Sequence, residues 1–264
     1  MLPTIYLPHG GGPWPWMDEA SFGGPQAYGP LRAWLQALPS TLPAARALLV
    51  VTAHWEEARP TLSSASAPGM LYDYGGFPPH TYQVRYPAPG DPALAERTRG
   101  LLEEAGISAG LDPVRGYDHG TFVPVAVGWP EAKLPVVQLS LVRGLDPGLH
   151  LAIGRALRPL REEGVLILGS GMSYHNLGAF FRGTGEAEAL LFDEWLARSV
   201  ELPPAEREAA LRSWDRAPSA RTVHPREEHL LPLMVAAGAA GEDRGRVSFR
   251  ERVLGKPVLA VQFG

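Results

Sequence analysis

The sequence predicts a single α/β domain with a central, mostly parallel or mixed sheet flanked by helices. Short apolar runs rich in β-branched residues alternate along the chain with longer segments of helical periodicity. The 27 prolines and 30 glycines are dispersed between these segments and do not gather into a linker. We therefore expect residues 1–264 to form one domain, although a chain of 264 residues could also hold two smaller ones.

Five apolar runs are the expected strands. The run of Ala47–Thr52 is the strongest, because its centre is continuously apolar, as in a strand buried on both faces. In chain order the five runs are Ile5–Leu7, Ala47–Thr52, Val136–Leu141, Val165–Leu168 and Val258–Phe263.

Four segments between these runs have helical patterns: Pro92–Ala105, Leu149–Glu163, Ala187–Val200 and about Glu227–Ala237. The first has clear boundaries, with Asp91 as N-cap, Pro92 at the first helical position and Gly106 after the end. Pro159 interrupts the second pattern. The segment Tyr72–Gly90, rich in proline and glycine, is expected to be a long ordered loop.

Composition excludes several classes of function. The net charge of −4 gives no electrostatic footprint for nucleic acid. No apolar run approaches the roughly 18 residues that could span a membrane, and the N-terminus lacks a secretion signal, so we expect a cytoplasmic protein. Because the chain has no cysteine, a bound metal would be held by imidazole, carboxylate or water.

Five histidines stand in short motifs rich in glycine, proline or aromatic residues, spread over the whole chain. Histidine is the commonest metal ligand in proteins, and it also changes its charge near neutral pH. The motifs are His9 in Leu-Pro-His-Gly-Gly-Gly-Pro, His54 in Thr-Ala-His-Trp, His119 in Tyr-Asp-His-Gly, His175 in Met-Ser-Tyr-His-Asn and His229 in Glu-Glu-His-Leu-Leu-Pro-Leu.

The placement of these histidines predicts one metal site. His9 directly follows the first expected strand, His54 comes two residues after the second, and His175 lies beyond the fourth, across an expected turn at 169–171. In open α/β sheets, ligands bind outside the carboxyl ends of the strands, so these three side chains should converge on one crevice. His229, at the start of an expected helix, could reach the same crevice from the side.

Each motif also has a structural interpretation. His54 beside Trp55 could be a packed core residue, His9 could mark a turn, and His119 could sit in a turn that Asp118 caps. No P-loop, His-Glu-x-x-His or EF-hand pattern is present, and Gly169-Ser170-Gly171 is only half of a nucleophile elbow. The remaining histidines lack a matching motif and are expected to be structural or exposed: His80, His150 and His224.

Taken together, the motifs resemble those of the class III extradiol ring-cleavage dioxygenases, most closely the 4,5-DOPA dioxygenase extradiol branch. They occur in the family's order and cover nearly the whole chain. The matching segments are Pro8-His9-Gly10, Thr52-Ala53-His54-Trp55, Gly75-Gly76-Phe77-Pro78 with Tyr86-Pro87-Ala88-Pro89-Gly90, Asp118-His119-Gly120, Val137-Gln138-Leu139-Ser140, Gly171-Met172-Ser173 with His175-Asn176-Leu177, and Glu228-His229-Leu230-Leu231-Pro232-Leu233.

The resemblance implies a ligand set. His9, His54 and His229 correspond to ligands of one divalent metal, with His175 against it, either as a fourth ligand in a zinc form or as the acid/base in an iron form. The wider superfamily binds Fe(II) through two histidines and a carboxylate, so a glutamate beside His229 stays open as a ligand. Fe(II) is the cofactor expected for activity, and Zn(II) is the alternative bound metal.

The resemblance also implies a reaction, in which O2 opens the ring of a catechol beside its hydroxyl-bearing carbons and a semialdehyde results. His175 would take a catechol proton and later return it, and His119 would hydrogen-bond the oxygen, with Asp118 orienting it. A zinc-dependent hydrolase and a Memo-like metal-binding protein are the alternatives. The presence of both catalytic candidates, His119 and His175, favours an enzyme. A homo-oligomer is compatible with the sequence.

The loop Tyr72–Gly90 supplies the candidate substrate contacts. Tyr74, Phe77 and His80 offer flat faces that suit stacking on an aromatic ring, and the expected substrate is a small catechol with a polar or carboxylate substituent. The alternative is that these side chains only pack the loop onto the sheet. The sequence candidates for pairing with a substrate carboxylate are Arg85 and Arg182.

Overall fold

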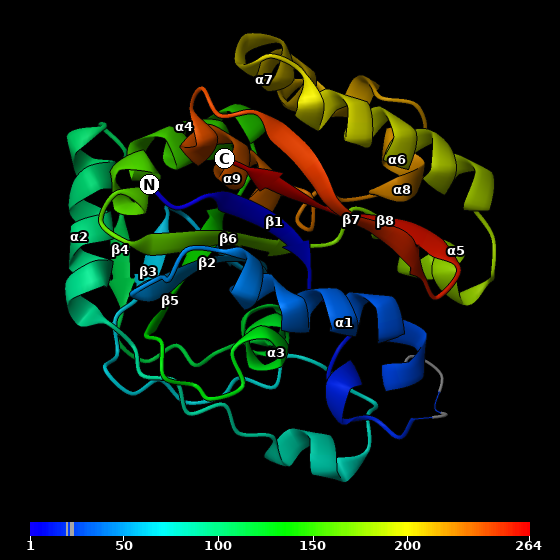
Figure 1. The fold of residues 1–264 in the computed structure, drawn as a ribbon, viewed down its shortest axis with the longest axis horizontal. Helices are drawn as coiled ribbons and strands as arrows, with labels where there is room; N and C mark the ends of the chain where they lie inside the picture. The colour runs from blue at the N-terminus through cyan, green and yellow to red at the C-terminus, as the bar shows by residue number, and fades with distance from the viewer. Residues whose placement is uncertain (20, 22–23) are drawn as a thin grey trace.

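A computed structural model describes residues 1–19, 21 and 24–264 of the chain (Figure 1). In this part of the chain, eight strands form one sheet in the order β4-β3-β5-β2-β6-β1-β8-β7. The strands are β1 Thr4–Pro8, β2 Ala47–Glu57, β3 Thr61–Ser63, β4 Gly110–Asp112, β5 Val136–Val142, β6 Val165–Gly171, β7 Gly245–Val253 and β8 Lys256–Phe263.

The sheet is mixed, with a parallel centre, as the sequence predicts. Strands β5, β2, β6 and β1 run parallel to one another, whereas β3 pairs antiparallel with β5 and β8 pairs antiparallel with β1. The carboxyl ends of the four central strands therefore lie at one edge of the sheet, which is where an α/β sheet binds its ligands.

Both faces of the central strands are buried, which explains why their sequences are continuously apolar. Successive side chains of a strand point to opposite faces. In β2, Leu48 and Val50 accordingly belong to one hydrophobic cluster, and Leu49 and Val51 belong to the other.

Helices cover the two faces. Figure 1 shows α1 and α3 on one side of the sheet and α4, α6 and α9 on the other. Among the described residues, no helix is both long and apolar enough to cross a membrane. The helices are α1 Gly29–Ala37, α2 Pro92–Glu104, α3 His119–Gly128, α4 Pro147–Leu157, α5 Leu177–Phe181, α6 Glu186–Glu201, α7 Pro204–Arg212, α8 Ala220–Val223 and α9 Leu231–Ala240.

Two expected helices have different boundaries in the structure. Helix α4 starts after the N-cap Asp146 and ends at Leu157, and a short 3₁₀ helix with Pro159 near its start follows. Helix α9 begins at Leu231 and not near Glu227, so His229 lies in the turn that precedes the helix. The other two expected helices, α2 and α6, are confirmed to within one residue at each end.

Two local expectations about the histidine segments are wrong. Residues 169–171 form the last part of β6 and not a turn, because they continue the parallel pairing with β1 up to the Pro8–Gly171 pair. His54 does not follow β2 but lies inside it, where the register against β5 shifts between Val51 and Glu56. Such an irregularity changes the direction in which a strand side chain points.

Candidate metal centre

Three histidines meet at the carboxyl-end edge of the sheet. His9 directly follows β1, and its backbone N–H donates to the Gly171 carbonyl at 3.1 Å, which extends the pairing with β6 by one residue. His54 projects from the irregular part of β2. His229 comes from the turn before α9, and its carbonyl accepts a hydrogen bond from the Tyr6 hydroxyl at 2.8 Å.

The Nε2 atoms of these residues converge. His54 Nε2 lies 3.1 Å from His9 Nε2 and 3.2 Å from His229 Nε2. Within the described residues, these three side chains form a group whose ligand atoms all lie within 4.8 Å of one another. One ion can therefore be reached by all three side chains.

The other ring nitrogen of each histidine faces an acceptor. His9 Nδ1 lies 3.0 Å from the Gly10 carbonyl, His229 Nδ1 lies 3.0 Å from Glu228 Oε1, and His54 Nδ1 lies 3.4 Å from Asp73 Oδ2. These acceptors favour a proton on each Nδ1. Each Nε2 then carries a lone pair, which is directed at the Nε2 atoms of the other two histidines. Three lone pairs at this separation repel one another unless a cation lies between them, so the residues fit a divalent metal.

Burial favours the neutral form that a ligand needs. Desolvation, together with the neighbouring histidines, lowers the pKa of His9 and His229 well below the ordinary value. Desolvation and His119 lower the pKa of His54 to about 3, against a smaller opposing effect of Asp73. Neutral imidazoles can coordinate a metal without first losing a proton.

The two candidate catalytic histidines lie beside the three-histidine group. His119 is the first residue of α3, and its ring centroid is 3.9 Å from that of His54. His175 stacks on His229, with ring centroids 3.4 Å apart and planes 21° apart, and its Nδ1 lies 3.0 Å from Glu228 Oε1. The structure thus places His175 against the group but not among its three converging nitrogens.

Two carboxylates each connect a member of the group to a candidate catalytic histidine. Asp73 accepts from His119 Nδ1 at 2.8 Å through one oxygen and faces His54 through the other. Glu228 Oε1 contacts both His175 and His229. Although burial opposes ionisation, the hydrogen bonds from His119 and His175 hold the pKa values of Asp73 and Glu228 below their usual values.

The expectation that Asp118 orients the His119 ring is not met. Asp118 Oδ1 accepts from the Thr52 hydroxyl at 2.8 Å and from the Thr121 N–H at 3.0 Å, and its other oxygen pairs with Arg115 at 2.9 Å. Asp118 therefore caps α3, which places the backbone of His119. Asp73 orients the ring, and sequence reasoning missed it although it is the only acidic residue in 72–90.

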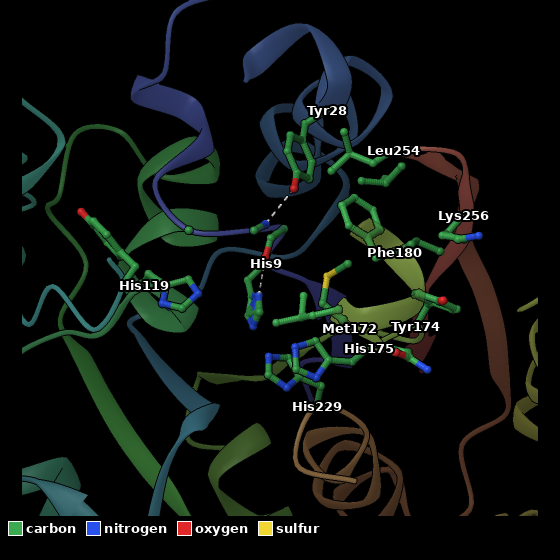
Figure 2. Close-up of a pocket in the computed structure, with 18 of the residues that line it drawn as sticks. His9, Tyr28, His119, Met172, Tyr174, His175, Phe180, His229, Leu254 and Lys256 are labelled. Atoms are coloured by element: carbon green, nitrogen blue, oxygen red, sulfur yellow. Dashed lines mark hydrogen bonds between the residues drawn. The ribbon is translucent and has the colours of Figure 1, made fainter. Parts of the chain in front are cut away.

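A cavity of about 390 Å³ opens over the histidines (Figure 2). Tyr74 and Phe77 line it, as expected, but His80 does not, because its Nε2 is 2.8 Å from the Trp16 carbonyl. The Tyr74 hydroxyl donates to the Thr81 carbonyl at 2.7 Å, so this ring also holds its own loop together. The aromatic residues of the loop thus line the cavity and also pack the loop together.

The basic residue at the cavity is a different one from those expected. Among its described lining residues are neither Arg85 nor Arg182, whereas Lys256, at the start of β8, is one of them. Sequence reasoning missed Lys256, because nothing near it in the sequence marks it as a site residue.

Comparison with known proteins shows the family of the chain. A family model described as the catalytic LigB subunit of aromatic ring-opening dioxygenase matches residues 3–257. The chain belongs to this family. The chain is therefore an extradiol ring-cleavage dioxygenase.

Individual relatives agree with this assignment. The 4,5-DOPA dioxygenase extradiol of Beta vulgaris is 41% identical over 81% of this chain and 79% of its own length. Dioxygenase tasH of Hapsidospora irregularis is 36% identical over 100% of this chain and 86% of its own. The crystal structure of an uncharacterized protein from Escherichia coli K12 has a TM-score of 0.80 at 29% identity, with each chain fully covered.

Proposed function

We propose that residues 1–264 form one catalytic domain that opens the ring of a small catechol with O2, beside the two hydroxyl-bearing carbons. The observation that carries the proposal is the convergence of three Nε2 atoms at 3.1 and 3.2 Å, each on a ring whose Nδ1 faces an acceptor. Both oxygen atoms of O2 end in the product, a hydroxylated semialdehyde, so the reaction needs no external reductant.

The metal proposed for activity is Fe(II), held by His9, His54 and His229, and Zn(II) is the alternative occupant of the same ligands. A bound divalent ion lowers the pKa of a coordinated hydroxyl and holds the catechol and O2 together. Nitrogen ligands of this kind suit both ions. Glu228 is not proposed as a ligand, because its carboxylate already contacts the imidazoles of His175 and His229.

His175 is proposed as the acid/base. Its Nδ1 is held by Glu228, so Nε2 is the nitrogen left for the cavity that it lines. There it would take a proton from a catechol hydroxyl and return it to an oxygen of the product as the ring opens. An imidazole suits both transfers, because its ordinary pKa lies near neutral pH.

His119 is proposed to hydrogen-bond the oxygen that is added to the ring. Asp73 fixes its Nδ1 at 2.8 Å, which leaves Nε2 on the side of the cavity. The Tyr74 ring lies 5.8 Å from the His119 ring at an interplanar angle of 81°, and Phe77 extends this aromatic wall. We propose that the catechol packs against this wall.

Anaerobic reconstitution tests the proposal. Protein stripped of metal and loaded with Fe(II) should convert catechols to yellow ring-opened products when O2 is admitted. Elemental analysis should find about one metal per chain, and the His9→Ala, His54→Ala and His229→Ala variants should lose it. Unchanged metal content in all three variants would overturn the ligand assignment, and colourless products from every catechol would overturn the reaction.

A further inference from the structure

The side of the cavity away from His119 contains a buried cation. Figure 2 shows His119, His9, Met172, Tyr174 and Lys256 following one another across the cavity. Lys256 is only 5% exposed, and its ammonium donates to the Thr184 carbonyl at 2.7 Å. An ammonium has three N–H donors, so two of them have no acceptor among the described residues.

The charge of Lys256 has no counter-ion in the described part of the chain. None of the ion pairs there includes Lys256, although Lys133, the only other lysine, pairs with Glu131 at 2.5 Å. The ammonium lies 5.7 Å from the centroid of the Tyr174 ring. A buried cation without a counter-ion is unfavourable, and buried charges in proteins are normally paired with an opposite charge.

A second buried polar group, the Tyr174 hydroxyl, belongs to a residue beside Lys256. Tyr174 is 6% exposed and lines the cavity, yet its hydroxyl has no hydrogen-bond partner among the described residues. Tyr174 also directly precedes His175, so one short segment carries both this hydroxyl and the proposed acid/base.

We propose that Lys256 and Tyr174 form an anion-binding subsite that selects catechols with a carboxylate on a side chain. A carboxylate accepts hydrogen bonds through both of its oxygens, so it satisfies the free N–H groups of Lys256 and the hydroxyl of Tyr174 together. The catechol ring then lies over the three-histidine group, and its substituent points along the cavity to β8. This inference rests on the proposed function, because it identifies the substituent of the same substrate.

The test compares an acid with its ester on the Fe(II)-loaded enzyme. The probes are 3-(3,4-dihydroxyphenyl)propanoate and its methyl ester, which differ in the charge of the side chain. The wild type should open the acid with a kcat/KM about tenfold or more above that of the ester. A charge-assisted hydrogen bond to the carboxylate strengthens binding by about this factor. In Lys256→Met this ratio should fall close to one, through a rise in KM for the acid.

Matched variants separate recognition from folding. Lys133→Met removes the only other lysine and should keep the wild-type ratio. Lys256→Arg should keep part of the preference for the acid over the ester. Tyr174→Phe should lower this preference less than Lys256→Met does. Metal content and melting temperature identify any variant that fails to fold. An acid-to-ester ratio in Lys256→Met equal to that of the wild type would overturn the subsite.

Equilibrium binding separates the subsite from the reaction. Calorimetry with 3-(4-hydroxyphenyl)propanoate and its methyl ester uses monophenols that cannot bind as catechols. A preference for the acid that Lys256→Met abolishes supports the subsite even if no ring opening is observed, in which case the proposed function fails alone. Ring opening of both catechols, with no preference for an acid in either assay, overturns the subsite alone.

Discussion

At the scale of single residues, the centre is organised by two shared carboxylates. Asp73 holds His54 and His119, and Glu228 holds His229 and His175. Each acid therefore fixes the tautomer of one proposed ligand and of one proposed catalytic histidine at the same time. A disturbance of either acid should be felt in metal binding and in turnover together.

Asp73→Asn tests this coupling. An asparagine offers one oxygen and one NH2 group, so its NH2 must face the Nδ1–H of either His54 or His119. One of these rings then loses its acceptor and its favoured tautomer. We expect turnover or metal affinity to fall by roughly 10–100-fold. Steady-state kinetics and metal content on the same preparation provide the measurement.

The matched control for this variant is Asp215→Asn, which makes the same chemical change at an exposed position away from the cavity. Asp215→Asn should leave turnover and metal affinity at the wild-type level. Wild-type turnover together with wild-type metal content in Asp73→Asn would show that Asp73 does not position the two rings.

At the scale of elements, close backbone packing places His229. A side chain at Gly171, the last residue of β6, would collide with the His229 carbonyl, and one at Gly169 would collide with that of Pro232. The end of β6 is thus a flat surface against which the turn before α9 rests. The Tyr6 hydroxyl fixes the same turn from β1 by its bond to the His229 carbonyl.

Gly171→Ala should therefore displace His229. The added methyl group has no room against the His229 backbone, and such overpacking costs about 1–3 kcal/mol of stability. Metal affinity should fall as well, because one proposed ligand moves. Denaturant unfolding measures the stability, and metal titration measures the affinity for the metal.

Gly100→Ala is the control, because Gly100 lies inside α2 with no atom within 4 Å of the added methyl group. It should raise stability by about 0.5–1 kcal/mol and leave metal affinity unchanged. Equal metal affinities in Gly171→Ala and the wild type would mean that the contact at β6 does not position His229.

The sequence predicted five of the strands from their apolar runs and missed other elements, helix α1 among them. The five apolar runs became β1, β2, β5, β6 and β8. The strands β3 and β4 have three residues each, too few for a recognisable pattern, and β7 is a partly exposed edge strand with charged residues. Helix α3 was missed because it is apolar on all sides and contains Pro124, so it has no helical periodicity.

The sequence likewise predicted part of the candidate site. Each of the five motif histidines lines the cavity. His9, His54 and His175 lie in or after strands whose carboxyl ends meet at one edge of the sheet, and His119 and His229 lie at or just before the start of a helix. The direction of His54 depends on an irregularity in β2 that pairing with β5 creates. Asp73 and Lys256 reach the site through tertiary packing, and the only local signal at either position is that Asp73 is the one acidic residue in 72–90.

At the scale of the whole molecule, two further histidines are buried without lining the cavity, as expected for structural residues. His224 has no exposed surface, its Nε2 lies 3.0 Å from the Ser173 carbonyl, and burial together with His175 lowers its pKa to about 3. His150 is equally buried, and burial lowers its pKa too. Its Nε2 accepts from the Val142 N–H at 3.1 Å, which requires the neutral ring.

These two histidines should make the fold sensitive to mild acid. In the unfolded chain a histidine titrates near pH 6.5, at about its unperturbed pKa. The folded protein keeps His224 neutral down to about pH 3, so between these values the unfolded state binds one more proton at this residue. The free energy of unfolding therefore decreases as the pH falls below about 6.5, by roughly 1.4 kcal/mol per pH unit from His224, and the lowered pKa of His150 acts in the same direction.

His224→Gln isolates one of these contributions. Glutamine can still donate to the Ser173 carbonyl but does not titrate, so the variant should show a shallower dependence of unfolding free energy on pH between about 6 and 4, by about 1.4 kcal/mol per pH unit. Urea unfolding of both proteins, kept in chelator so that metal release does not contribute, gives the two slopes. Replacement of a buried ring lowers stability at every pH, so the slope and not the absolute stability is decisive. Parallel curves would mean that His224 is protonated in the folded protein, and that its burial does not make the fold sensitive to acid.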